Sequence, residues 1–134
     1  MIQSVGGMEE GIDQEERRRR LREQPVTAIE PHGEARVVRI GGELDLYNAP
    51  VLRETLLTVC RSGAERVVLD FADVEFIDST ALGALLEARA TLPNKRALMI
   101  ASPRIETRRA LQVSGLDRHL PVHDSVDEAL AAEL

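Results

Sequence analysis

The sequence predicts a single α/β domain built on a mixed, mostly parallel sheet of four to five strands, packed by about four helices. Three observations lead to this fold class. Short apolar runs typical of buried strands alternate with segments that carry apolar residues at helical spacing. Cap-forming residues and prolines mark the expected helix starts. The length of 134 residues, 43% of them hydrophobic, suits one domain with one core.

The first regular segments predict an antiparallel hairpin at one edge of the sheet. Residues 26–30 and 34–40 alternate as β segments do, and Pro-His-Gly at 31–33 forms the turn between them. Gly41 and Gly42 are expected to break the second segment. Helices separate the later strands, so these strands are expected to be parallel, with right-handed crossovers.

The remaining elements follow in a regular order. We expect helix 48–62, strand 66–71, an acidic loop at 72–77, helix 80–92, strand 96–101, helix 103–114, a short strand within 116–122 and a final helix. The expected N-caps are Asn48 for the first helix, Ser102 for the third, and Asp124 or Ser125 for the last. Cys60 falls in the apolar pattern of the first helix and is expected to be a small core residue.

Composition narrows the possible functions. A formal net charge of −6 disfavours nonspecific binding to a nucleic-acid backbone, and a content of two phenylalanines, one tyrosine and no tryptophan disfavours base stacking. A lone cysteine cannot form an internal disulfide. No apolar stretch approaches 18 residues and no secretory leader is recognised. We therefore expect a cytoplasmic protein without direct contact to nucleic acid or membrane.

Residues 1–24 differ from the domain expected at 25–134. Two glutamates at 15–16 precede four arginines at 17–20, and little apolar surface is available for burial. The segment is either a disordered tail or a short solvated helix held by glutamate–arginine pairs. A basic docking patch is the functional alternative, although the neighbouring acids nearly cancel its charge.

No histidine, cysteine or serine motif in the chain predicts catalysis, and we expect no cofactor. His32, His119 and His123 lack metal-ligand spacing with one another or with Cys60. Ser79 has no nucleophile-elbow motif around it and no base other than carboxylates nearby. We therefore expect a protein that is not an enzyme.

The most informative stretch is residues 78–83, which opens a helix directly after a strand and its acidic loop. Asp78, Ser79 and Thr80 are all competent helix caps, and one helix needs only one. Ser79 is either that cap or a free hydroxyl at a place that favours negative charge. The surplus of caps leaves at least one hydroxyl to face solvent.

Acidic residues gather near the same point. Glu43 and Asp45 follow one expected strand, and Asp78 follows its parallel neighbour, so the three are expected at one edge of the sheet. They could form a divalent-metal site, an acidic docking rim, or simple caps that accept backbone N–H groups.

Several motifs, in this order and spacing, resemble the STAS domain of bacterial anti-sigma factor antagonists. The resemblance covers about residues 25–134. The motifs are Gly-Glu-Leu-Asp at 42–45, Asn-Ala-Pro at 48–50, Val-Leu-Asp-Phe at 68–71, Phe-Ile-Asp-Ser-Thr-Ala-Leu-Gly at 76–83 and Ser-Gly-Leu at 114–116.

The resemblance implies a regulator of transcription that binds an anti-sigma factor and thereby releases a sigma factor. The anti-sigma factor is usually a serine kinase with a histidine-kinase-like ATP domain. It phosphorylates the antagonist on the serine that matches Ser79, with Thr80 as the second candidate. A PP2C-type phosphatase reverses the modification.

The same resemblance places Asp45 and Asn48 on the partner-binding surface, with Asp78 and Thr80 flanking the modified residue. Glu43 adds a further acidic side chain to that surface. Phosphorylation would make this docking site more negative without unfolding the helix start that carries it.

One residue departs from the family pattern. Ala81 stands where the family usually has glycine, and its methyl group is expected to stiffen the helix start and slightly narrow partner access. Two other functions stay open: a constitutive scaffold or adaptor that is never phosphorylated, and a small nucleotide- or anion-binding module that uses the helix starts.

Overall fold

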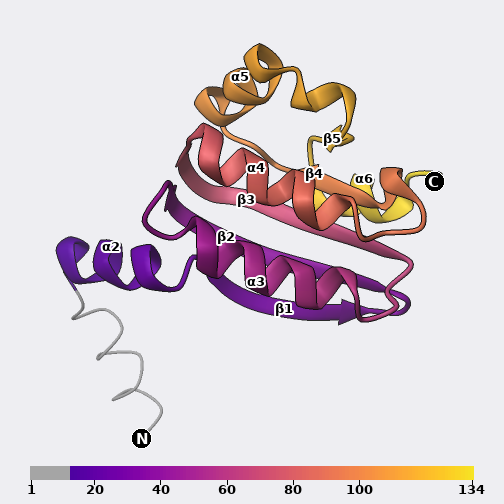
Figure 1. Ribbon diagram of the computed structural model, residues 1–134, viewed down its shortest axis with the longest axis horizontal. Coiled ribbons are helices and arrows are strands. Elements are labelled where there is room, and N and C mark those ends of the chain that lie inside the picture. Colours follow the sequence, from indigo (N-terminus) through magenta and orange to yellow (C-terminus); the bar gives the residue numbers. More distant parts are fainter. Residues whose placement is uncertain (1–12) are drawn as a thin grey trace, which may run out of the picture.

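The computed structural model describes residues 13–134, and the predictions for residues 1–12 lie outside this range. A five-stranded sheet has the order β1-β2-β3-β4-β5 (Figure 1). Strands β1 and β2 are antiparallel and every later pair is parallel, which confirms the mixed α/β fold and its antiparallel edge. The strands are β1 (Val26–His32), β2 (Ala35–Leu44), β3 (Arg66–Ile77), β4 (Leu98–Ala101) and β5 (Val122–His123).

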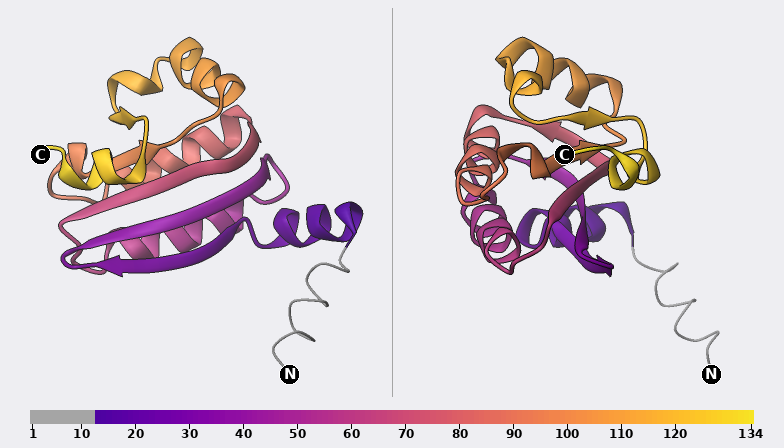
Figure 2. Two further views of the ribbon diagram at one scale, coloured as in Figure 1. Left: turned by 180° about the vertical axis from the view of Figure 1, so that it is seen from behind. Right: turned by 90° about the vertical axis from the view of Figure 1, so that its right-hand side faces the viewer.

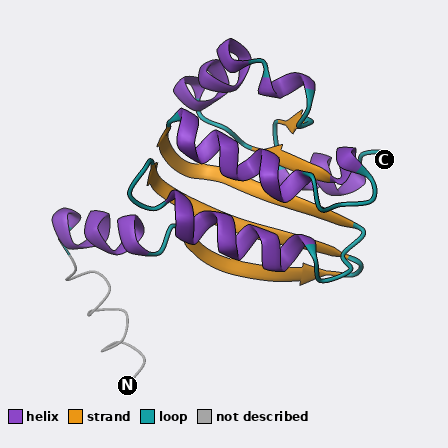
Figure 3. Ribbon diagram, in the orientation of Figure 1, coloured by secondary structure: helices purple, strands orange, loops and turns teal. Residues whose placement is uncertain are grey.

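Helices cover both faces of the sheet. Figure 3 shows α3 and α4 side by side on one face, and Figure 2 shows α6 on the other. None of the helices between residues 13 and 134 has the length and apolar character needed to cross a bilayer. The helices are α2 (Gln14–Glu23), α3 (Ala49–Cys60), α4 (Ser79–Arg89), α5 (Ile105–Ser114) and α6 (Val126–Ala131), with short 3₁₀ turns η1 (Lys95–Ala97) and η2 (Leu116–Arg118).

The alternation of side chains along the strands builds two cores. Val38 and Leu69 belong to the large cluster under α3 and α4, whereas their neighbours Val37 and Val68 belong to a smaller cluster with Ala129 of α6. Successive residues of a strand point to opposite faces, so near-continuous apolar runs are what a sheet covered on both faces requires.

Cys60 is buried at the end of α3, as the sequence predicts. Burial raises the pKa of its thiol to about 11, because the surrounding apolar side chains disfavour the thiolate. The thiol therefore stays protonated at neutral pH and packs as a small apolar group.

The predicted break at the glycine pair and the predicted acidic loop are both wrong. β2 continues through Gly41 and Gly42 to Leu44, and β3 continues to Ile77 beside it. Gly42 adopts a φ of 82°, and register shifts on either side absorb the irregularity. The acidic side chains of this part of β3 face solvent, so they are compatible with a strand.

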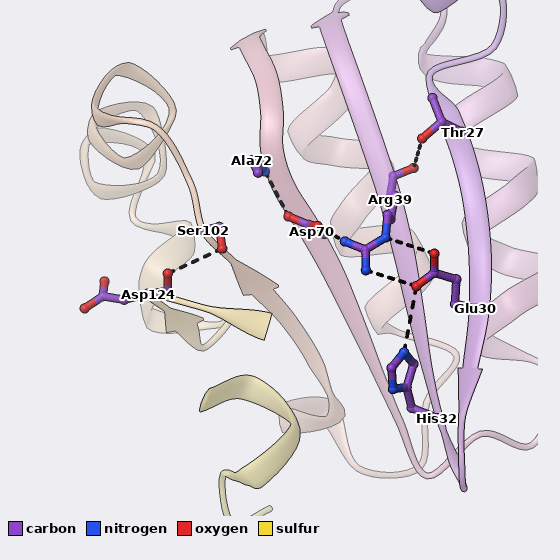
Figure 4. Close-up of polar contacts among 8 residues, drawn as sticks. All are labelled: Thr27, Glu30, His32, Arg39, Asp70, Ala72, Ser102 and Asp124. Carbon is purple, nitrogen blue, oxygen red and sulfur yellow. Dashed lines mark hydrogen bonds and ion pairs between the residues drawn. The ribbon is translucent and has the colours of Figure 1, made fainter. Parts of the chain in front are cut away.

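The predicted start of the third helix is also wrong. Ser102 has a φ of 59° and its hydroxyl donates to the backbone carbonyl of Asp124 at 3.3 Å, so it does not cap α5 (Figure 4). The N-cap position belongs to Arg104 instead. For the last helix, Ser125 is the cap: its hydroxyl accepts the amide of Glu128 at 3.0 Å.

The face of the sheet beside α6 carries a network of ion pairs across β1, β2 and β3 (Figure 4). The guanidinium of Arg39 donates to both carboxylate oxygens of Glu30 at 3.0 Å and also to Asp70. These bonds lower the pKa of Glu30 and raise that of Arg39. The network joins strands β1, β2 and β3.

The N-terminal segment contains a helix. α2 is capped by Asp13, whose carboxylate accepts the amide of Glu16 at 2.8 Å, and it has no buried residue. Glu16 lies 3.3 Å from Arg19 and 3.8 Å from Arg20. Over Gln14–Glu23 the chain therefore has the form of a solvated helix with glutamate–arginine pairs.

Candidate functional site

The ends of β2 and β3 bring the loop before α3 next to the start of α4. Glu43 pairs with Phe76 and Leu44 with Ile77, and the amide of Asp78 then donates to the carbonyl of Leu44 at 3.0 Å. The loop that follows β2 and the start of α4 therefore lie side by side, at the edge where the parallel order places them.

Asp78 is the cap of α4. Its backbone is extended, and its carboxylate oxygen Oδ1 accepts the amide of Ala81 at 3.0 Å. Its own carbonyl accepts the amide of Leu82 at 3.0 Å, which starts the helical ladder. Of the three competent caps in the sequence, the first one takes the position.

This capping arrangement leaves Ser79 free. Ser79 is the first residue of α4 and is exposed, as is Thr80 after it. Among residues 13–134 the hydroxyl of Ser79 has no hydrogen-bond partner, because the cap is already supplied by Asp78. An accessible hydroxyl thus lies beside backbone amides that have no intrahelical acceptor, at the positive end of the helix dipole.

Asn48 holds the loop before α3 in shape. It was expected to cap this helix and to lie on the partner-binding surface, but its side chain makes no cap and is only 1% exposed. Its amide nitrogen donates to the carbonyl of Glu43 at 2.8 Å, and its amide oxygen accepts the backbone N–H of Asp45 at 3.0 Å. Asn48 therefore shapes the surface from below.

Asp45 and Glu43 make contacts with the protein itself. One carboxylate oxygen of Asp45 accepts the amide of Tyr47 at 3.0 Å, and the other accepts the guanidinium of Arg22 at 2.8 Å. Glu43 is exposed and lies 3.6 Å from Arg22. Among residues 13–134 no three metal-binding side chains are grouped.

Three large apolar side chains near the ends of β2 and β3 are exposed. Leu46 is 73% exposed, Tyr47 59% and Phe76 52%. Large apolar groups that gather at the surface next to charged ones are typical of a protein–protein contact site. We define the docking surface as Glu43, Asp45, Leu46, Tyr47, Phe76 and Asp78–Thr80.

A groove between α3 and α4 adjoins the docking surface. Its volume is about 340 Å³. Arg53 of α3 donates to Glu87 of α4 at 3.0 Å and ties the two helices together across it. The lining residues are Leu46, Ala49, Pro50, Arg53, Glu54, Thr80, Ala84 and Glu87.

Ala81 does not narrow access to the docking surface. The expectation of a methyl group in the partner's path is wrong, because Ala81 is fully buried and belongs to the large core cluster. Its side chain points inward beneath the exposed Ser79. The alanine in place of glycine therefore adds a methyl group to the core and does not alter the docking surface.

Two parts of the site could not be located by motif spacing. Leu46 and Tyr47 are consecutive apolar residues within a polar loop, which was an available signal of an exposed patch. Arg22 gave no local signal, since its contact with Asp45 joins residues 23 positions apart.

The comparison with family models now identifies the fold. Residues 27–129 match the family described as STAS domain, and the chain belongs to this family. The ends of β2 and β3, with the start of α4, lie within the matched region.

Individual relatives agree with this assignment. The chain is 30% identical over 97 residues to the anti-sigma-B factor antagonist of Staphylococcus epidermidis, an alignment that covers 72% of this chain and 90% of that protein. The structure of this chain is similar to that of an anti-sigma factor antagonist from Mycobacterium paratuberculosis, with a TM-score of 0.71 and 29% identity. The match covers 77% of this chain and 88% of the Mycobacterium chain.

A third relative has been solved in a modified state. The phosphorylated form of SpoIIAA, the Bacillus cell fate determinant, is similar to this chain with a TM-score of 0.58 and 25% identity. The match covers 77% of this chain and 95% of that one.

The assignment of the cap can be tested by two neighbouring substitutions. Asp78→Ala should lower the free energy of unfolding by about 0.5–2 kcal/mol, because the amide of Ala81 loses its acceptor. Ser79→Ala should change it by less than about 0.5 kcal/mol, because the hydroxyl has no partner to lose. Urea unfolding measures both, and a Ser79→Ala cost equal to that of Asp78→Ala would show that the cap is misassigned.

Proposed function

We propose that this chain is an anti-sigma factor antagonist: a regulatory binding protein, without catalytic activity, that binds an anti-sigma factor and frees a sigma factor. Membership of the STAS family supports this, as does the similarity to anti-sigma factor antagonists from Staphylococcus and Mycobacterium. The observation that carries the proposal is the exposed hydroxyl of Ser79 beside an acidic and apolar docking surface.

Ser79 is the proposed switch. The partner is an anti-sigma factor with serine kinase activity, which transfers the γ-phosphoryl group of ATP to the hydroxyl oxygen; the hydroxyl proton is lost and ADP leaves. A PP2C-type phosphatase hydrolyses the ester and restores serine and inorganic phosphate. The phosphorylated form of SpoIIAA shows that a protein of this fold exists in a phosphorylated state.

The position of Ser79 makes this chemistry compatible with a stable fold. A phosphate adds a charge of about −1.5 to −2 at neutral pH. At the start of α4 this charge meets free amides and the positive end of the helix dipole, so the helix tolerates it. The consequence appears on the surface, where Glu43, Asp45 and Asp78 are already negative.

The size of the effect can be bounded. A partner carboxylate within ~4 Å of the new charge would be repelled by a few kcal/mol at an effective dielectric constant near 20. Each decade in affinity corresponds to about 1.4 kcal/mol, so the repulsion amounts to roughly two to three decades. With a partner carboxylate at that distance, a single phosphorylation would be sufficient to switch the complex off.

A constitutive adaptor is the second candidate, and one observation favours it. Leu46, Tyr47 and Phe76 are exposed apolar side chains that could hold a partner whatever the state of Ser79. The two functions differ in whether added charge at position 79 changes binding.

The switch predicts a specific pattern of affinities. With a purified serine-kinase anti-sigma factor from the same genome, Ser79→Ala should bind like the wild type, and Ser79→Asp should bind at least about tenfold more weakly. Gln112→Glu adds the same charge on exposed α5, far along the chain from the docking surface, and should bind normally. Isothermal titration calorimetry measures the three, and equal affinity for both Ser79 variants would leave only the adaptor.

The modified residue can be assigned separately. Incubation with the same kinase and labelled ATP should label the wild type and Thr80→Ala, and leave Ser79→Ala unlabelled. Thr80 is also exposed and lines the groove between α3 and α4, so it is the alternative acceptor. Label retained in Ser79→Ala and lost in Thr80→Ala would move the switch to Thr80.

A further inference from the structure

Helix α2 lies against the end of β2, next to the docking surface (Figure 1). It precedes the region that matches the STAS family, which begins at residue 27. Leu21 of α2 packs over the glycine pair: a Cβ atom at Gly42 would lie 2.8 Å from the Cβ of Leu21, and one at Gly41 would lie 3.4 Å from its Cδ2. The two glycines therefore leave the space that Leu21 occupies.

Arg22 of α2 engages the docking surface directly. Its guanidinium donates to Asp45 at 2.8 Å, lies 3.6 Å from Glu43 and is centred 4.9 Å from the ring centroid of Tyr47. One side chain thus contacts two acids and one aromatic ring of the surface that the proposed function assigns to a partner. A partner that pairs with Asp45 must take the place of Arg22.

The attachment of α2 is suited to reversal. The helix has no buried residue, and the side chain of Arg22 is 39% exposed. Half-exposed ion pairs hold weakly and are screened by salt. Charge favours the contact, since α2 carries five arginines against three glutamates whereas the whole chain has a net charge of −6.

We propose that α2 is an intramolecular competitor for the docking surface, which a partner must displace in order to bind. The inference rests on the proposed function, because it concerns the same surface. When only a fraction of the molecules has α2 detached, the apparent association constant for the partner equals the intrinsic constant multiplied by that fraction. Weakening the attachment therefore raises affinity without adding any contact to the partner.

The test uses the full chain and three matched variants. Arg22→Ala and Leu21→Ala each remove one contact of α2, whereas Arg19→Ala removes the same charge from the same helix at a side chain that is 68% exposed and contacts Glu16. Titrated into the purified serine-kinase anti-sigma factor, Arg22→Ala and Leu21→Ala should bind about three- to tenfold more tightly than wild type. Arg19→Ala should bind like wild type.

Amide hydrogen exchange gives a second measurement. The amides of α2 should exchange faster in the complex than in the free protein, because the partner displaces the helix. Slower exchange in the complex, or weaker binding of Arg22→Ala, would show that α2 belongs to the interface and would overturn the inference. Unchanged affinity for both variants would also overturn it and leave the proposed function standing. Absence of binding by wild type and all variants would overturn the proposed function and this inference with it.

Discussion

The carboxylate of Asp78 accepts the amide of Ala81, and this one cap determines where the hydroxyl of Ser79 lies. Because the cap is taken, Ser79 becomes the first residue of α4 and its side chain remains exposed. Ala81 then turns into the core. Three residues at the start of α4 thus have different roles: Asp78 caps the helix, the hydroxyl of Ser79 stays free for chemistry, and Ala81 anchors the first turn in the core.

The position of the Asp78 cap depends on how far β2 and β3 extend. β2 and β3 remain paired to Leu44 and Ile77, and the amide of Asp78 continues the pairing by donating to Leu44. The buried side chain of Asn48 holds the loop between β2 and α3 through two hydrogen bonds of its amide group. Strand pairing and the hydrogen bonds of Asn48 therefore hold the docking surface in shape, which suits a site that must recognise a partner and respond to a single added charge.

Local patterns predicted the elements whose signals are local. The hairpin, the buried Cys60 and the start of α4 follow from alternation, helical spacing and cap residues. The hairpin turn lies at residues 33–34 and not at the predicted 31–33, because Pro31 and His32 still pair with β2. The carboxylates at the end of β3 predict an exposed loop, and this prediction is wrong because the exposed face of a strand can also carry them.

Tertiary contacts account for the other errors. Asn48 has the residue type of a cap, yet its side-chain amide donates to the backbone carbonyl of Glu43 near the end of β2. Ser102 does not cap α5, because its hydroxyl donates to the backbone carbonyl of Asp124, 22 residues later in the chain. The contact of Arg22 with Asp45 has no local pattern at all, so the proximity of α2 to the docking surface could be known only from the fold.

The central claim is that position 79 carries a dianion without harm to the fold. The most direct measurement compares the full chain with and without phosphoserine incorporated at position 79, by two-dimensional ¹H–¹⁵N NMR. The account predicts shift changes confined to the docking surface and the first turn of α4, with the resonances of the core unchanged. Shift changes spread through β3, β4 and the core, or loss of the dispersed spectrum, would contradict it.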